Sequence, residues 1–307
     1  MILRSVKITA LILALLLFTT NCRAESVDVY SLAISGTPQQ LKEAVKNGVN
    51  FNLSSDDESH EYEVYDISSV RAGNAWFIYH NESPLHIAAA LNRNPESIKF
   101  LISLGLDVNA EAEDGSFTRT PLSCAVDYKN FGAIHELLEA GANPEGWTLG
   151  GWYVATPFHD VAAWYGYNTE EVRYVLGELI KAGGNVNVHD ENVNAEAVLE
   201  ELETLRDDLN PDNSDALDGD TFHYMIRNNT LFSRTGWLHF AASCTPLIYA
   251  VFYDNPLTVE VLLDLGADAK IRSVEGKTAM DYARELPENS NLKKSPVYAR
   301  LMKAAEN

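Results

Sequence analysis

The sequence predicts a mostly helical solenoid of about six helix-pair units, interrupted by long loop or hairpin insertions. Three observations support this fold class. A Ser/Thr-Pro pair recurs at residues 83–84, 120–121, 156–157 and 245–246. Each pair opens a run rich in small residues, which is followed by a turn and a second apolar run, and each unit closes on a glycine. One helix pair cannot bury its own apolar face, so at least about three units must stack side by side.

The first helix of each unit is predicted to begin at its Ser/Thr-Pro pair. The hydroxyl group can accept a hydrogen bond from a backbone N–H group of the first turn, which has no partner within the helix. The proline then occupies the first helical position, where it loses no hydrogen bond. Alanines such as Ala88, Ala125 and Ala250 follow, and their small side chains let a neighbouring unit approach closely.

The second helix is predicted from apolar residues at three- and four-residue spacing, as in Ile98, Leu101 and Ile102. This spacing places them on one face of a helix. Gly105 and Gly141 follow two of these runs. We expect each glycine to adopt the left-handed backbone conformation that commonly ends a helix.

These motifs resemble the ankyrin repeat, whose signature is a Thr-Pro-Leu-His-x-Ala run followed by a Gly-Ala-Asp-x-Asn turn, at a period of about 33 residues. Residues 83–88 read SPLHIA, and residues 245–250 read TPLIYA. The prolines of successive copies are 37, 36 and 89 residues apart, so insertions interrupt the period. The motif histidine survives as His86 and His159. We expect both rings to bond backbone groups and the capping hydroxyls rather than to act as bases.

The repeats are assigned to a single domain, residues 25–307, with atypical units at both ends as caps. Insertions 53–82 and 188–244 hold most of the remaining chain. The first is predicted to be an extended hairpin, and shorter hairpin loops are predicted at 110–119 and 145–155. In the second, apolar spacing over 195–209 predicts an amphipathic helix, and residues 219–223 are insertion or, alternatively, a broken repeat. The repeats lie near residues 28–52, 83–109, 120–144, 156–187, 245–270 and 276–305.

Residues 1–24 are predicted to be a secretory signal peptide. Arg4 and Lys7 precede an apolar run over residues 8–18, which is too short for a membrane span of about 20 residues. Cleavage is expected after Ala24, and the alternative is a lipid anchor at Cys22. The sequence thus predicts an exported protein, periplasmic or secreted, with a bacterial periplasm favoured because no disulfide framework is visible.

The composition is acidic, with 44 acidic and 23 basic residues and a formal net charge of −21. Nucleic acid and acidic membranes should repel such a chain, whereas a basic protein would be attracted. Dispersed acidic residues also simply keep a protein soluble. Cys124 and Cys244 lie two recognisable repeats apart, so their Cα atoms should exceed the roughly 7 Å limit for a disulfide. We expect both to be buried free thiols.

No sequence pattern predicts catalysis, a cofactor or a metal centre. The eight histidines show no metal-binding or catalytic spacing, and we find no Gly-rich phosphate loop. Asp208, Asn210 and Asp212 stand at alternating positions of a calcium loop. That loop then lacks its turn glycine and its closing acidic residue. The prediction is therefore a protein without catalytic, cofactor-binding or metal-binding residues.

The resemblance implies that partners bind a concave face, formed by the hairpin loops and the late positions of the first helices. Leu91, Tyr128, Trp164 and Tyr253 would form a stripe along this face, and exposed Trp and Tyr are enriched at binding hot spots. The alternative is that the insertions fold over the stripe and bury it. Carried over repeat by repeat, the predicted partner-binding residues are Tyr79, Glu82, Leu91, Phe117, Arg119, Asp127, Tyr128, Trp152, Tyr153, Trp164, Phe252 and Tyr253.

The predicted function is a non-enzymatic, monomeric protein–protein interaction module that binds a partner on its acidic, aromatic concave face. A sharper alternative is an immunity-type inhibitor of a secreted toxin or effector, because opposite charges speed the capture of a basic toxin. The competing class is an enzyme or a calcium-dependent module formed by insertion 188–244.

Overall fold

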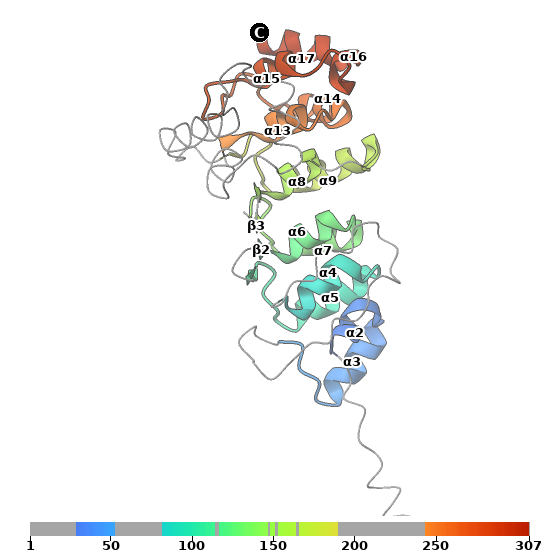
Figure 1. Ribbon diagram of the computed structural model, residues 1–307. Coiled ribbons are helices and arrows are strands. Elements are labelled where there is room, and N and C mark those ends of the chain that lie inside the picture. The colour runs from blue at the N-terminus through green and yellow to red at the C-terminus, as the bar shows by residue number, and fades with distance from the viewer. Residues whose placement is uncertain are drawn as a thin grey trace, which may run out of the picture.

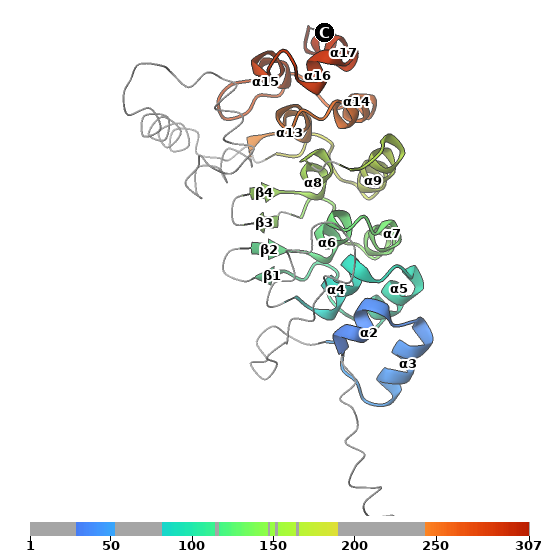
Figure 2. The same cartoon turned by 45° about the vertical axis from the view of Figure 1, so that its right-hand side comes forward.

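The computed structural model describes residues 29–52, 82–113, 117–146, 148–150, 153–163, 166–189 and 243–306. Helix pairs follow one another along a single stack, from α2 and α3 at the N-terminal end to α15 and α17 at the C-terminal end (Figure 1). The stack has two rows of helices, and the β-strands lie beside only one of them (Figure 2). We call the row beside the strands the inner row and the other the outer row. The predicted helical solenoid is confirmed.

Each pair contributes its first helix to the inner row and its second helix to the outer row. The inner row comprises α2 (Val29–Ser35), α4 (Pro84–Leu91), α6 (Pro121–Asp127), α8 (Pro157–Ala163), α13 (Pro246–Phe252) and α15 (Ala279–Glu285). The outer row comprises α3 (Pro38–Lys46), α5 (Pro95–Ser103), α7 (Phe131–Glu139), α9 (Thr169–Lys181), α14 (Pro256–Asp264) and α17 (Val297–Glu306), and a short helix α16 (Asn291–Lys294) precedes α17.

The ends of the helices follow the predicted chemistry. Thr120 Oγ1 accepts a hydrogen bond from the backbone N–H of Ser123 at 3.2 Å, and Thr245 Oγ1 accepts one from Ile248 at 3.3 Å. A proline occupies the first turn of both helices. Gly141, after α7, has a φ of +90°, a conformation that glycine adopts without steric cost.

The main core fills the space between the rows. The inner-row alanines Ala88, Ala125, Ala162 and Ala250 are fully buried, and α4 packs against α6 and α8 against α13. Without longer side chains between them, adjacent inner helices approach closely. The outer row adds large apolar residues such as Leu137, whose truncation to alanine should cost about 2–5 kcal/mol.

Two β-hairpins project from the inner row. They consist of β1 (Ala112–Glu113) with β2 (Phe117–Arg119), and β3 (Thr148–Gly150) with β4 (Tyr153–Ala155). Strands appear where the sequence predicted hairpin loops. The sequence did not predict that β2 pairs antiparallel with β3, which joins the hairpins of adjacent units into one four-stranded sheet. This pairing fixes the two hairpins relative to one another.

The turn between the two helices of a unit reaches back to the preceding unit. Asn130, between α6 and α7, donates from Nδ2 to the carbonyl oxygens of Ala89 and Asn92, both at 2.8 Å. Its Oδ1 accepts from the N–H of Ala133 at 3.4 Å and so caps α7. Asn92 makes the equivalent backward contact, at 2.9 Å to the carbonyl oxygen of Ala33. A buried asparagine thus ties neighbouring units through backbone acceptors.

The residue directly before the turn asparagine, Lys129 before Asn130 and Asp254 before Asn255, contacts the next unit. Lys129 and Asp254 have φ values of 51° and 53°, which are uncommon for residues with a Cβ atom. The Lys129 ammonium donates to the carbonyl oxygen of Gly166. The Asp254 carboxylate accepts from the N–H groups of Asn291 and Leu292, each at 2.8 Å, at the start of α16.

The fourth and fifth units stack directly, although residues 190–242 separate them in the sequence. The inner helices α8 and α13 pack together, as do the outer helices α9 and α14. His159 Nε2 donates to the carbonyl oxygen of Cys244 at 2.7 Å, and Asn187 Oδ1 accepts from the N–H of Asp268 at 2.8 Å. The hairpin predicted in 53–82 and the amphipathic helix predicted over 195–209 fall outside the described residues, apart from Glu82.

Candidate protein-interaction face

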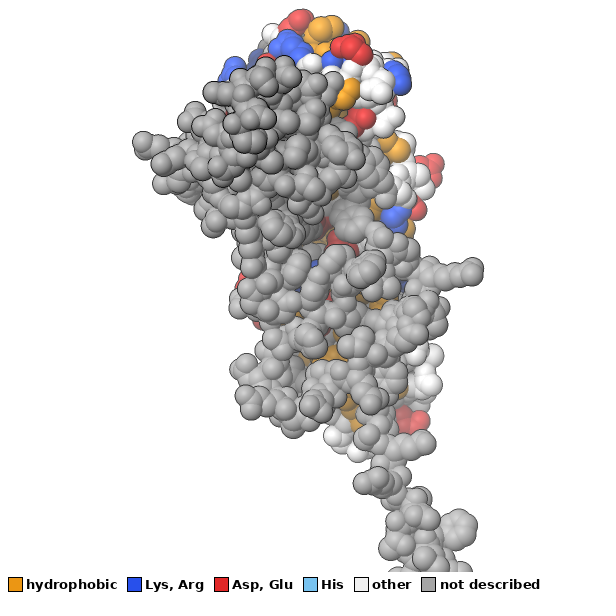
Figure 3. Space-filling model, viewed as in Figure 1, with side chains coloured by type: hydrophobic (Ala, Val, Ile, Leu, Met, Phe, Trp, Pro, Cys, Tyr) orange, Lys and Arg blue, Asp and Glu red, His pale blue; other side chains and the backbone are white. Residues whose placement is uncertain are grey.

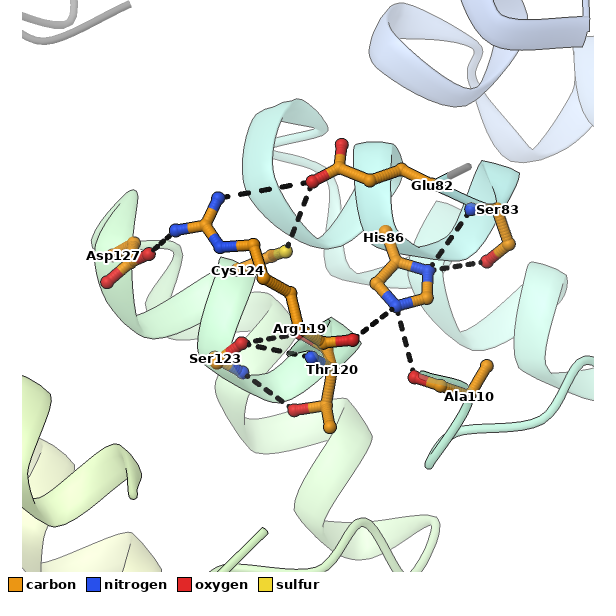
Figure 4. A network of polar contacts seen from close by, with 9 residues as sticks. All are labelled: Glu82, Ser83, His86, Ala110, Arg119, Thr120, Ser123, Cys124 and Asp127. Carbon is orange, nitrogen blue, oxygen red and sulfur yellow. Dashed lines mark hydrogen bonds and ion pairs between the residues drawn. The ribbon is translucent and has the colours of Figure 1, made fainter. Parts of the chain in front are cut away.

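Four of the predicted partner-binding residues meet at the inner row of the second and third units. Glu82 lies two residues before α4, Arg119 ends β2, Asp127 ends α6, and Tyr128 follows it. Figure 4 shows the Arg119 guanidinium lying between the Glu82 and Asp127 carboxylates, beside the Cys124 thiol. Their positions in the sequence are up to 46 residues apart, and the stacking of α4 on α6 brings them together.

The Glu82–Arg119–Asp127 cluster holds two carboxylates and one guanidinium. Arg119 Nη2 donates to Asp127 Oδ2, and Arg119 Nη1 lies 3.9 Å from Glu82 Oε1. The carboxylate side chains of Glu82 and Asp127 are each 5% exposed, and the Arg119 side chain is 14% exposed. Such burial makes the ionic interactions strong and makes any unbalanced charge costly.

Burial also moves the pKa values of this cluster. It raises the pKa of Glu82 from 4.5 to about 7, against the opposing effect of the Arg119 charge. The pKa of Asp127 is raised by burial too, while the neighbouring guanidinium lowers it. The pKa of the Cys124 thiol, which lies 3.9 Å from Glu82 Oε1, is raised well above its usual value, chiefly by burial. This thiol is therefore protonated at neutral pH.

A histidine holds the backbone of this cluster in place. His86 Nε2 lies 3.1 Å from both the Ala110 and the Arg119 carbonyl oxygens. Its Nδ1 accepts from the N–H of Ser83 at 3.2 Å and lies 2.8 Å from the Ser83 hydroxyl. Burial lowers the pKa of His86 to about 4, so the ring is neutral at pH 7. The predicted structural role of His86 is confirmed, and His159 makes the equivalent contacts with Thr156 and Cys244.

A small apolar cluster lies beside these charges, separate from the main core. It contains Ile87, Ala90, Leu91 and Cys124, and the partly buried Tyr30, Ile34 and Tyr128 pack against it. The sequence prediction placed Leu91 on an exposed stripe, but Leu91 is only 9% exposed. Exposure was therefore predicted wrongly for Leu91, because its side chain packs within this cluster. Tyr128 remains partly exposed.

In the fifth unit, too, one predicted partner-binding residue is buried and another is partly exposed. Phe252 is 3% exposed and belongs to the main core, so its predicted exposure is also wrong. Tyr253 is partly exposed, and its ring centroid lies 5.6 Å from that of Tyr249. Tyr79, Trp152 and Trp164 lie outside the described residues. The backbone of Phe117 and Tyr153 lies in β2 and β4, and their side chains fall outside what is described.

Sequence reasoning selected Glu82, Arg119, Asp127 and Tyr128 one by one, but it missed Cys124, Tyr30 and the contact between the carboxylates and Arg119. The tyrosine hydroxyl of Tyr30 donates to the carbonyl oxygen of Glu82 at 3.3 Å. One signal was present: Arg119 directly precedes the Thr-Pro pair and Asp127 ends the seven-residue helix that follows. Charged residues at both ends of an otherwise apolar inner helix indicate a local ion pair.

The described part of the chain contains no group of three or more His, Cys, Asp or Glu side chains that could hold a metal ion. The partial calcium pattern at 208–212 falls outside it. Among the helices described, none has the length and apolar character needed to cross a membrane. Acidic, basic and hydrophobic side chains lie intermixed over the C-terminal helices (Figure 3).

Comparison with known proteins supports the repeat assignment. A family pattern of three ankyrin repeats matches residues 33–146, and a single ankyrin repeat matches residues 242–274. The chain therefore contains ankyrin repeats, which suggest a protein–protein interaction module and imply a protein partner. Ankyrin repeats are generally non-enzymatic.

Two curated relatives are mitochondrial disaggregases. The human protein is 29% identical over 205 residues, which cover 67% of this chain and 25% of that protein. The Bos taurus protein is 30% identical over 197 residues, which cover 64% of this chain and 20% of that protein. The chain thus spans about a quarter or less of their length. Because these relatives are mitochondrial by name, the predicted periplasmic or secreted location is contradicted, and the prediction of a bacterial exported protein finds no support.

Proposed function

We propose that this chain is a non-catalytic protein-binding module, and that its partner contacts the inner row beside the hairpins. The observation that carries this proposal is the meeting of Glu82, Arg119, Asp127 and Tyr128 between the second and third units. Glu82, Arg119 and the adjacent pair Asp127 and Tyr128 come from three separate segments. The side chains of three of these residues are held by contacts that fix their geometry. The Glu82 and Asp127 side chains are each only 5% exposed, so a partner would contact the partly exposed Tyr128 that lies beside them. A side chain that is already ordered before binding loses little conformational entropy when a partner arrives.

The charge of the chain supports a basic partner. The net charge of −21 attracts cationic proteins at long range, and added salt should weaken this attraction. Tyr128 and Tyr253 supply the partly exposed aromatic surface among the predicted contacts. Tyrosines in such positions are typical binding hot spots, where truncation costs about 2 kcal/mol or more.

The experiment compares capture of binding partners by three forms of the protein. The first is the wild type, the second carries Tyr128→Ala and Tyr253→Ala, and the third carries Tyr174→Ala. Tyr174 is 42% exposed on the outer helix α9 and serves as the matched control. We expect a protein that the wild type and the Tyr174 variant retain, at low salt more than at high salt, and that the double variant loses. Circular dichroism verifies that all three forms keep their helices.

Equal capture by all three forms would show that the partner does not use the inner row. Loss with the Tyr174 variant alone would move the interface to the outer row. Either result would refute the proposed face.

The relatives support a mitochondrial setting for this module. Both are named mitochondrial disaggregases, so a partner connected with protein disaggregation in mitochondria is a specific candidate. Fractionation of cells that express the tagged chain tests the location. Recovery of the chain outside mitochondria would contradict it, without affecting the question of which face binds.

A further inference from the structure

Glu82 joins three consecutive units. Its backbone carbonyl accepts a hydrogen bond from Tyr30 of α2 in the first unit. Glu82 itself lies at the start of the second unit, directly before Ser83 and α4. Its carboxylate faces Arg119 and Cys124, which belong to β2 and α6 on the side of the third unit. A change at this carboxylate therefore acts where the units meet.

Among the residues that the structure describes, the charges that face Glu82 balance only when it is protonated. Arg119 is the cation, Asp127 is the second carboxylate, and the neutral groups nearby are the Cys124 thiol, the Tyr128 and Tyr30 hydroxyls and the His86 ring. With Glu82 neutral, one guanidinium faces one carboxylate. With Glu82 ionised, one guanidinium faces two carboxylates, and a negative charge is left over in a site that is almost closed to water. Burying such a charge is unfavourable.

We propose that the contact between the second and third units is a proton-dependent clasp, closed while Glu82 carries a proton and opening more readily once Glu82 is ionised. Opening brings the Glu82 carboxylate into water, where its ionisation costs little. If the inner row binds a protein, as proposed above, this clasp makes binding at that face depend on pH near neutrality. That last step rests on the proposed function, whereas the clasp itself does not.

The size of the effect follows from the two states of Glu82. Its pKa is about 7 in the closed state, and it is close to 4.5 where the carboxylate reaches water. Because the closed state binds the proton more tightly, the closed state is favoured at low pH and loses that advantage as pH rises from 4.5 to 7. Between pH 6 and pH 8 the opening equilibrium should increase about tenfold.

The reactivity of Cys124 measures this opening, because its thiol is buried in the small apolar cluster beside Glu82. A variant with Cys22→Ser and Cys244→Ala leaves Cys124 as the single thiol. Its reaction with a thiol reagent is measured under native conditions from pH 6 to pH 8. Each rate is divided by the rate of the denatured chain at the same pH, which removes the titration of the thiol itself. The same measurement follows Cys244, which is buried far along the stack, in a variant with Cys22→Ser and Cys124→Ala.

We expect the corrected rate at Cys124 to rise about tenfold from pH 6 to pH 8, with a smaller change at Cys244. Adding Glu82→Gln should remove the rise, and Glu96→Gln, which changes an exposed carboxylate on α5, should keep it. An unchanged rate at Cys124, the same rise with Glu82→Gln, or an equal rise at Cys244 would each overturn the proposal. The comparison of Cys124 with Cys244 in the two single-thiol variants, both with Glu82 unchanged, tests the proposal even if Glu82→Gln fails to fold. No partner is needed, so failure here leaves the proposed function untouched.

Discussion

Asn130 offers the sharpest test of how neighbouring units are held together. In Asn130→Ala, the carbonyl oxygens of Ala89 and Asn92 each lose a donor at 2.8 Å, and α7 loses the cap on Ala133. Each buried hydrogen bond contributes about 1 kcal/mol net, and a lost asparagine cap costs about 1 kcal/mol. Asn130 is only 3% exposed, so water replaces these bonds poorly. The variant should lose about 2–4 kcal/mol of unfolding free energy.

Urea denaturation followed by circular dichroism measures this loss. Asn94→Ala is the matched control, because Asn94 caps α5 through the N–H of Glu96 at 3.1 Å, and its loss should cost about 1 kcal/mol. Asn130→Asp separates the two roles, since the carboxylate keeps the cap but cannot donate to the two carbonyls. We expect Asn130→Asp to be nearly as destabilised as Asn130→Ala. If Asn130→Ala proves no more destabilised than Asn94→Ala, the backward bonds do not contribute as argued.

Three further predictions concern the stability and stacking of the units. Asp254→Ala should cost about 2 kcal/mol and speed hydrogen exchange in α16 more than in α6, because two N–H groups lose their acceptor; uniform exchange would contradict this. Burial lowers the pKa of His86 and of His159 from 6.5 to about 4, so each should lose about 2 kcal/mol of stabilisation as pH falls from 7 to 5. Denaturation of His86→Gln with His159→Gln should show a weaker pH dependence than the wild type, and an identical profile would refute the assignment. Replacing residues 190–242 by Gly-Ser-Gly places Thr245 eight positions after Asn187, the same spacing as from Lys270 to Thr278 between the fifth and sixth units. The helical signal of α8, α9, α13 and α14 should persist in this variant. Loss of that signal would show that the segment is needed for stacking.

The repeats were predictable because their signals are local. A hydroxyl, a proline and a glycine specify where a helix begins and ends, and Thr120, Pro121 and Gly141 occupy the expected positions in the structure. The hairpin loops were predictable for the same reason. The pairing of β2 with β3 was not, because short strands of different units carry no sequence signal for register.

The candidate face was predictable only in part. Positions carried over from the resemblance identified Glu82, Arg119, Asp127 and Tyr128, but not that they contact one another. The exposure of Leu91 and Phe252 was predicted wrongly because an inner helix here is buried on more than one side. Periodicity shows which residues face the main core, and it does not reveal a second apolar cluster on the opposite side.

The direct stacking of α8 on α13 bears on how cooperatively the molecule unfolds. Repeat stacks gain stability from interfaces between neighbours, so the weakest interface divides the stack. Forming the interface between the fourth and fifth units requires the chain to close over residues 190–242, whereas the fifth and sixth units are joined by a short connection. For a connection of this length, the entropic cost of closure exceeds that of the short one by about 2 kcal/mol on chain length alone. The units of residues 29–189 and those of residues 243–306 should therefore separate first, giving an unfolding intermediate in which one segment is still stacked.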